Sequence, residues 1–260
     1  KAQKLIQADW SSEENKSSPD IFDLYKQSVA EDPGTEIKVA GDFSAAKENA
    51  SQLLSVEYTL PYLAHATMEP QNCVVDANDK GMQIWASTQG PDMARIAAAR
   101  ASRYSVDDIQ VHTTFLGGGF GRRIVQDFIE ECAEIADRLQ KPIKLIWSRE
   151  EDTQHDWYRP ATYHKLSATL NSDTQPEGWQ HQIAGPKVFD YLVRNAAPAQ
   201  YPFMPKFTYD LLAASGKMGE GIIAPTDTSS TEGADNYPYA IPNQDIRFTH
   251  VDPGIPIGYW

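Results

Sequence analysis

Long hydrophobic runs are missing from this 260-residue chain. No apolar stretch approaches the roughly 18 residues that a membrane-spanning helix needs. The opening residues, Lys-Ala-Gln-Lys-Leu-Ile, also lack the extended apolar core of a secretion signal. We therefore expect no signal or transmembrane segment in these residues, and an opening of this kind predicts a fragment of a longer protein.

Basic residues and metal-binding patterns are also scarce. The chain has 23 Lys and Arg against 36 Asp and Glu, a net charge of −13, which argues against nucleic acid as a partner. Its six histidines and two cysteines form no His-x3-His or Cys-x2-Cys pair, so we expect no metal site. Cys132 falls on an apolar helical stripe and is expected to be packed.

What the chain does contain is a glycine-rich loop, with glycine at four of the five positions from Gly117 to Gly121. The residues before it, 109–115, alternate as a strand does. The residues after it repeat apolar side chains at helical spacing from Ile124 to Leu139. Pro142 predicts that this helix ends near Gln140, and residues 143–147 read as the next strand.

Two interpretations of this loop stay open from its residues alone. Free N–H groups at a helix start form an anion site. Arg122 and Arg123 in a first helical turn would oppose the helix dipole by about 0.3–1 kcal/mol each, a penalty that a bound anion removes. The other interpretation is a tight turn whose arginines face water. The loop lacks the lysine of a nucleotide-binding loop and does not match the dinucleotide fingerprint.

The rest of the pattern predicts an α+β fold of mixed sheets with packed helices. We expect helices over 21–29, 44–54 (with Ser44 as N-cap) and 91–103, and strands over 56–60, 73–75, 82–88, 163–170 and 179–184. Residues 148–160 read as a solvated loop. Beyond 185 we expect long proline-rich loops, with short elements near 209–214 and 245–250. The pattern divides the chain into a polar leading segment (1–54), a glycine-loop α/β subdomain (55–150), and antiparallel strands with long loops (151–260).

Three segments, taken in order, resemble the molybdopterin-binding large subunit of the xanthine oxidase/aldehyde oxidase family. They are Ala64-His65-Ala66-Thr67-Met68-Glu69-Pro70, Thr88-Gln89-Gly90-Pro91 and Gly117-Gly118-Gly119-Phe120-Gly121-Arg122-Arg123. The first segment and the Arg-Arg ending are similar to the isoquinoline 1-oxidoreductase β-subunit branch, often labelled membrane-bound aldehyde dehydrogenase. The similarity extends over about residues 40–260.

The resemblance implies a fragment of a molybdenum hydroxylase. Family members hold molybdenum on a molybdopterin, commonly as its cytosine dinucleotide in bacteria, and oxidise an aldehyde or an N-heterocyclic aromatic. Electrons leave through 2Fe–2S clusters on a partner. The implied partners are the remainder of the large subunit, a small iron–sulfur subunit and the small-molecule substrate. The branch commonly carries an export signal, so we expect a periplasmic or membrane-associated location facing the periplasm.

The resemblance also assigns residues. Those that would contact the cofactor are Gln89, Gly118, Gly119, Phe120 and Gly121, and those that would hold the pocket wall are His65 and Glu69. The residues around the last two independently predict a buried connection in which both side chains bond to backbone.

Two positions depart from the family pattern. Leu63 stands where relatives of xanthine oxidase often carry a glutamine, and Ile124 where some carry a glutamate. The preference of those relatives for purine substrates therefore cannot be assigned to this chain. The family's general-base glutamate lies in a later motif, so we expect no catalytic residue here, and neither bound cofactor nor activity in the isolated fragment. The alternative is a non-catalytic binding or scaffold module that kept the fold and lost the cofactor, which the intact glycine loop opposes.

Overall fold

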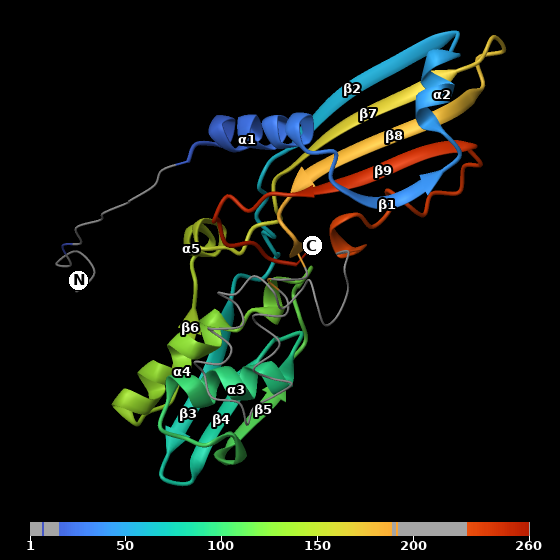
Figure 1. The fold of residues 1–260 in the computed structure, drawn as a ribbon. Coiled ribbons are helices and arrows are strands. Elements are labelled where there is room, and N and C mark those ends of the chain that lie inside the picture. The colour runs from blue at the N-terminus through green and yellow to red at the C-terminus, as the bar shows by residue number, and fades with distance from the viewer. Residues whose placement is uncertain (1–6, 8–15, 189–190, 192–227, 260) are drawn as a thin grey trace.

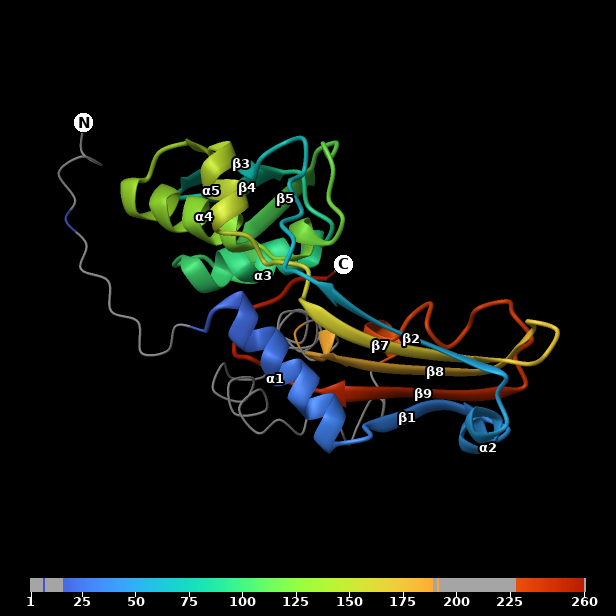
Figure 2. The ribbon, with the colours of Figure 1, turned by 90° about the horizontal axis from the view of Figure 1, so that it is seen from above.

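The computed structural model describes residue 7 and residues 16–188, 191 and 228–259. The described chain forms two lobes, each built on one sheet, and its C-terminal end lies between them (Figures 1 and 2). The first lobe contains β1 (Thr35–Ala40), β2 (Gln52–Leu60), β7 (Thr162–Leu170), β8 (Pro176–Gly185) and β9 (Asn243–His250), with α1 (Ser18–Glu31) and α2 (Phe43–Glu48). The second contains β3 (Asn72–Asn78), β4 (Gly81–Ala86), β5 (Ile109–Thr113) and β6 (Ile143–Ile146), with α3 (Pro91–Ala101) and α4 (Asp127–Leu139).

The first lobe is a five-stranded sheet in the order β1-β9-β8-β7-β2. Its pairs are antiparallel except β8 with β9, which run parallel. Helix α1 packs on one face, where Ile21, Tyr25 and Val29 contact the sheet residues Tyr163 and Ala184. Ser17 and Asp20 form a capping box that fixes the start of this helix.

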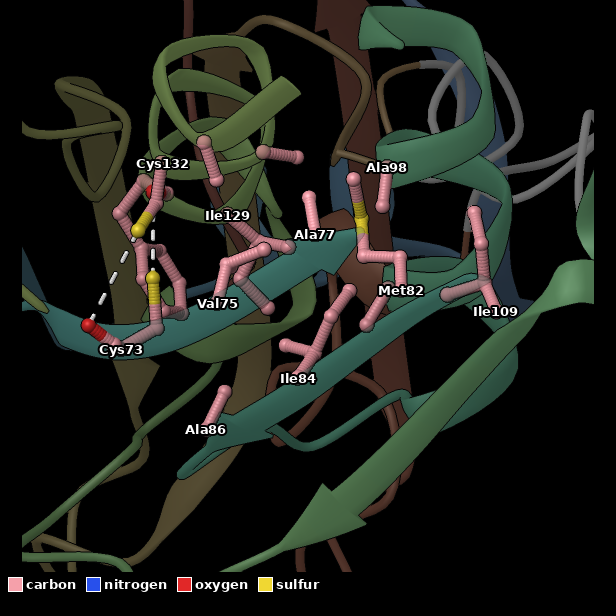
Figure 3. Close-up of a cluster of buried hydrophobic side chains, with 14 of the residues drawn as sticks. Cys73, Val75, Ala77, Met82, Ile84, Ala86, Ala98, Ile109, Ile129 and Cys132 are labelled. Carbon is pink, nitrogen blue, oxygen red and sulfur yellow. Dashed lines mark hydrogen bonds between the residues drawn. The ribbon is translucent and has the colours of Figure 1, made fainter. Parts of the chain in front are cut away.

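The second lobe is a four-stranded sheet in the order β5-β4-β3-β6, covered by α3 and α4. Its core joins alternate residues of β3 and β4, such as Val75 and Ile84, to the apolar stripe of α4 (Figure 3). Cys73 and Cys132 lie in this core as free, buried thiols, which confirms that Cys132 is packed. The glycine loop connects β5 to α4 at one end of this lobe.

Most predicted elements are confirmed, and so is the α+β class. The strands expected over 73–75 and 82–88 are β3 and β4, which form a hairpin whose turn closes with the pair Asn78 and Gly81, and α4 ends at Leu139 as Pro142 predicts. The element expected near 245–250 is β9. The element expected near 209–214 lies outside the described residues. None of the described helices is long and apolar enough to cross a bilayer.

The helix predicted over 44–54 is confirmed only over its first five residues. Asp42, rather than Ser44, caps α2 by accepting from the Ala45 N–H at 3.0 Å, and α2 ends at Glu48. Residues 52–60 instead form β2, because this segment pairs along its whole length with β7. The expected boundary after residue 54 therefore falls inside a strand, and the three-part division of the chain stays a prediction. Strand β1, which pairs with β9, was not predicted, and β8–β9 pairing is parallel where antiparallel strands were expected.

The solvated loop predicted over 148–160 is also wrong. Ser148 caps a short helix, α5 (Arg149–Gln154). Asp152 and Asp156 of this segment are buried, at 2% and 9% exposure. They are buried because each carboxylate has a cationic partner, Arg149 for Asp152 and Arg122 for Asp156.

Candidate cofactor site

The glycine loop follows β5 and turns back through three residues with positive φ. Gly118 has φ 103°, Phe120 54° and Gly121 97°. A side chain at Gly121 would run into the backbone carbonyl of Tyr259, so this position has no room for a Cβ. At Gly119 an added Cβ would lie 2.7 Å from Oε1 of Gln89. Glycine is therefore needed here both for conformation and for close approach.

Gln89 holds the turn from the neighbouring strand end. Its Oε1 accepts from the N–H of Gly121 at 3.1 Å and from the N–H of Arg123 at 3.2 Å. The backbone N–H of Gln89 donates to the Arg123 carbonyl at 3.1 Å. Both side-chain bonds use Oε1 and the side chain is exposed, so the Nε2 amide is available to donate to a bound group.

The side chains of the two arginines after the loop do not face water, and neither needs a bound anion to neutralise its charge. They lie in the 3-10 helix η3 (Arg122–Ile124), three residues before α4 begins, and are 1% and 0% exposed. Both alternatives for them are corrected, because protein carboxylates neutralise them. Arg122 bonds both oxygens of Asp127, at 3.0 and 2.9 Å, and reaches Asp156 at 2.8 Å.

Arg123 ties the three sequence motifs together. Its guanidinium donates to the Gly118 carbonyl at 2.8 Å, to the Ser87 hydroxyl at 2.8 Å and to the Glu69 backbone carbonyl at 2.7 Å. It also forms an ion pair with the Glu69 carboxylate at 3.0 Å. One buried side chain thus fixes the glycine loop, the strand leading to Gln89 and the first motif relative to one another.

Glu69 is a structural brace at the base of the loop. Its carboxylate accepts from Asn72 at 2.9 Å, Ser87 at 3.2 Å, Gly117 N–H at 2.9 Å and Arg123. Partial burial raises the pKa of Glu69, but hydrogen bonds from Asn72 and Gly117 and the charge of Arg123 outweigh burial and hold the pKa below its usual value.

His65 is buried beside the same region, at 5% exposure. Its backbone N–H and its Nδ1 both contact Asp156, at 2.5 and 3.1 Å. Burial raises the pKa of Asp156, yet hydrogen bonds from His65 and the nearby Arg122 charge lower it more. The prediction that both side chains bond to backbone is confirmed in part for Glu69, which accepts from the Gly117 N–H as well as from side chains, whereas the His65 ring contacts the Asp156 carboxylate.

The loop contains both unbonded polar groups and an exposed apolar side chain. Within the described part of the chain, the N–H groups of Gly118, Gly119 and Phe120 find no acceptor. The Phe120 ring is 59% exposed and lies against Gly118, whose added Cβ would be 3.3 Å from that ring. Met68 and Phe115 are also exposed. A ligand with an anionic or oxygen-rich end fits these donors.

A hollow of about 180 Å³ opens behind the turn, lined by Ile124 to Asp127, by Met93 and Arg100 of α3, and by Trp157. It is smaller than the roughly 300 Å³ at which small-molecule pockets begin. In the described residues, no group of three or more His, Cys, Asp or Glu is placed to hold a metal ion.

Sequence reasoning missed most of the supporting shell. Asp127 lies five residues after Arg122, and this short separation was a usable signal. Asp156 lies 91 residues from His65, and nothing in the sequence indicated that contact. Asn72, three residues after Glu69, was as close in the chain as a usable signal requires, whereas Ser87 lies 18 residues from Glu69.

Comparison with known proteins decides the family. The model of the molybdopterin cofactor-binding domain matches residues 24–186, more than half of the chain. The chain belongs to this family. Within it, the chain corresponds to part of the molybdopterin-binding domain of a xanthine oxidase family large subunit.

Two curated relatives and one solved structure illustrate the similarity. Isoquinoline 1-oxidoreductase subunit beta of Brevundimonas diminuta is 31% identical over 132 residues, 50% of this chain and 17% of that protein. The aldehyde oxidoreductase molybdenum-binding subunit PaoC of Escherichia coli K12 is 29% identical over 167 residues, 64% of this chain and 22% of that protein. Aldehyde oxidoreductase from Desulfovibrio gigas superposes with a TM-score of 0.56 at 15% identity, over 85% of this chain and 21% of that chain, which shows the shared fold. The chain thus spans about a fifth of the length of these relatives.

Proposed function

We propose that this chain forms part of the molybdopterin pocket in a molybdenum-dependent oxidoreductase that oxidises aldehydes or N-heterocyclic aromatics. The observation that carries the proposal is the glycine loop. The N–H groups of Gly118, Gly119 and Phe120 have no acceptor among the described residues, the Gln89 amide lies beside them, and Gly121 leaves no room for a Cβ. Relatives named for aldehyde, isoquinoline and nicotinate oxidation support the substrate class.

Each site residue has a distinct part in this proposal. Gly118, Gly119 and Phe120 donate backbone N–H groups to the oxygen-rich part of the cofactor, and Gln89 donates its side-chain amide. Gly121 serves the site indirectly, because its N–H is already bonded to Gln89. When bound, the molybdenum group supplies the two-electron oxidation of the substrate carbon.

Phe120 and the two pocket-wall residues complete the assignment. The exposed Phe120 ring offers an apolar wall to an aromatic or aldehyde substrate. Glu69 and His65 act as positioning residues through Arg123, Arg122 and Asp156, rather than as catalytic residues. Leu63 and Ile124 supply no polar group where purine hydroxylases often do, which favours a less polar substrate.

The rest of the pocket must come from other segments or subunits. The hollow behind the turn is below the size of a whole ligand site, and several relatives are named as subunits. We propose the remainder of the large subunit and a small 2Fe–2S subunit as partners, with the cofactor as a cytosine dinucleotide. The location proposed is periplasmic or membrane-associated, since one relative, 26% identical over 137 residues, is a membrane-bound aldehyde dehydrogenase.

Metal analysis of the full-length protein, purified from its own host together with its partner, tests the proposal. Close to one molybdenum per large subunit supports it and justifies a screen of aldehydes and N-heterocycles. A folded, matured complex without molybdenum contradicts it, and leaves the non-catalytic binding module as the better account.

A further inference from the structure

A second hollow lies in the other lobe, on the five-stranded sheet. Its volume is about 320 Å³, within the usual range for small-molecule pockets. Aromatic and aliphatic side chains line it: Leu166, Trp179, His181, Tyr237, Tyr239 and Ile241. None of these residues takes part in the glycine-loop site.

The sheet register explains why these side chains gather. Leu166 of β7 is the register partner of His181 of β8, and Trp179 lies two residues before His181, so all three share one face. Helix α1 covers the opposite face through Tyr163 and Ala184. The connection leading to β9 brings Tyr237 over the open face, with its ring centroid 6.3 Å from that of Trp179 in an edge-on arrangement.

Two buried hydrogen-bond donors of the lining residues have no partner among the described residues. Among the described residues, neither Trp179 Nε1 nor Tyr237 Oη has a partner, although both atoms are shielded from solvent. Gln244 does not line the hollow itself, but it is 7% exposed and lies directly across from Trp179 in the β8–β9 register, and its Oε1 acceptor also has no partner among the described residues. Buried polar atoms are nearly always paired, so three together indicate an absent partner.

We propose that this hollow binds a flat aromatic small molecule that carries a carbonyl group beside an N–H, such as an aromatic amide. The rings of Trp179 and Tyr237 match a planar apolar body. The ligand's carbonyl accepts from the indole N–H and the phenol, and its N–H donates to Gln244.

The charges around the hollow agree with a neutral ligand of this class. The Lys38 ammonium lies 5.2 Å from the centre of the Tyr237 ring and donates to the Asp235 carbonyl at 2.8 Å, so a cationic ligand is disfavoured. Burial raises the pKa of Tyr237, which keeps its phenol protonated as a donor. Burial, with His164 nearby, lowers the pKa of His181 to about 4, so this ring is neutral at pH 7.

Calorimetric titration of the whole purified chain with 2-naphthamide tests the proposal, and 2-methylnaphthalene is the control ligand without the amide. The variants Trp179→Phe and Tyr237→Phe each remove one donor and keep an aromatic ring. We expect each to weaken 2-naphthamide binding about fivefold and to leave 2-methylnaphthalene binding unchanged. Trp85→Phe, in the other lobe and stacked on His112, is the matched tryptophan control and should change neither.

Circular dichroism establishes that each variant is folded before titration. The proposal is overturned if the folded wild-type chain does not bind 2-naphthamide, or if both donor variants bind it as tightly as wild type. The proposal does not depend on the molybdenum site, so either can fail alone.

Discussion

The Arg123 guanidinium lies 3.0 Å from the Glu69 carboxylate, and this contact joins two motifs that are 54 residues apart in the chain. The Arg123 side chain is fully buried, while that of Glu69 is 33% exposed. Because Arg123 also donates to the Gly118 carbonyl, this ion pair fixes the glycine loop relative to the first motif.

Glu69→Gln removes the charge that balances a buried arginine. Because Glu69 itself is one-third exposed, we expect a loss of about 2 kcal/mol in the free energy of unfolding, less than for a fully buried pair. Glu134→Gln breaks the exposed pair with Arg138 and should cost only about 0.3 kcal/mol. Urea denaturation of both variants measures the difference, and equal losses would show that the Glu69 contact is not a brace.

Stability should fall as the solution becomes acidic. Glu69 and Asp156 have pKa values in the folded protein below their ordinary values of 4.5 and 3.8. As the pH falls, the unfolded chain therefore takes up these two protons before the folded chain does. The stability that is present above about pH 4.5 is lost as the pH falls through the pKa values of the folded protein. Asp156→Asn should flatten the pH dependence of the free energy of unfolding between pH 5 and pH 3. An unchanged slope would contradict the assignment.

Gly119→Ala should be costly only while Gln89 is present, because the new Cβ meets Oε1 of that side chain at 2.7 Å. The displaced Gln89 would lose its bonds to Gly121 and Arg123, at about 1 kcal/mol. In a Gln89→Ala background the same substitution should cost much less. A double-mutant cycle by thermal or urea unfolding measures this coupling, and simple additivity would contradict the contact.

The thiols of Cys73 and Cys132 should resist modification in the native protein. Both are buried in the core of the four-stranded lobe, at 2% and 0% exposure (Figure 3). We expect no reaction with a thiol reagent in buffer on the timescale of minutes, and two equivalents per chain in denaturant. Prompt reaction of either thiol under native conditions would show that this core opens readily.

Local signals in the sequence predicted the second lobe well. Apolar spacing located α4, and the ranges predicted over 91–103, 73–75 and 82–88 located α3, β3 and β4, because each element depends on neighbouring residues. The five-stranded sheet was predicted only in part. Strand β1 and the full length of β2 depend on pairing with β9 and β7, which are distant in the chain.

The sequence predicted those parts of the candidate site that lie within a recognisable motif. The motifs indicated the glycine loop and Gln89, and the structure places them in direct contact. The burial of Arg122 was not predictable, because its partner Asp156 lies in a segment whose charged composition is typical of a solvated loop. Charge alone does not distinguish a water-facing carboxylate from one that neutralises a buried arginine.

Pterin content tests the central claim most directly. The full-length protein is purified with its partner as wild type, Gly119→Ala and the surface control Glu134→Gln, and each is oxidised to release the fluorescent pterin for quantification. The account predicts close to one pterin per chain for wild type and for Glu134→Gln, and at least a tenfold loss for folded Gly119→Ala. Equal pterin content in Gly119→Ala and wild type would show that the glycine loop is not a wall of the cofactor site.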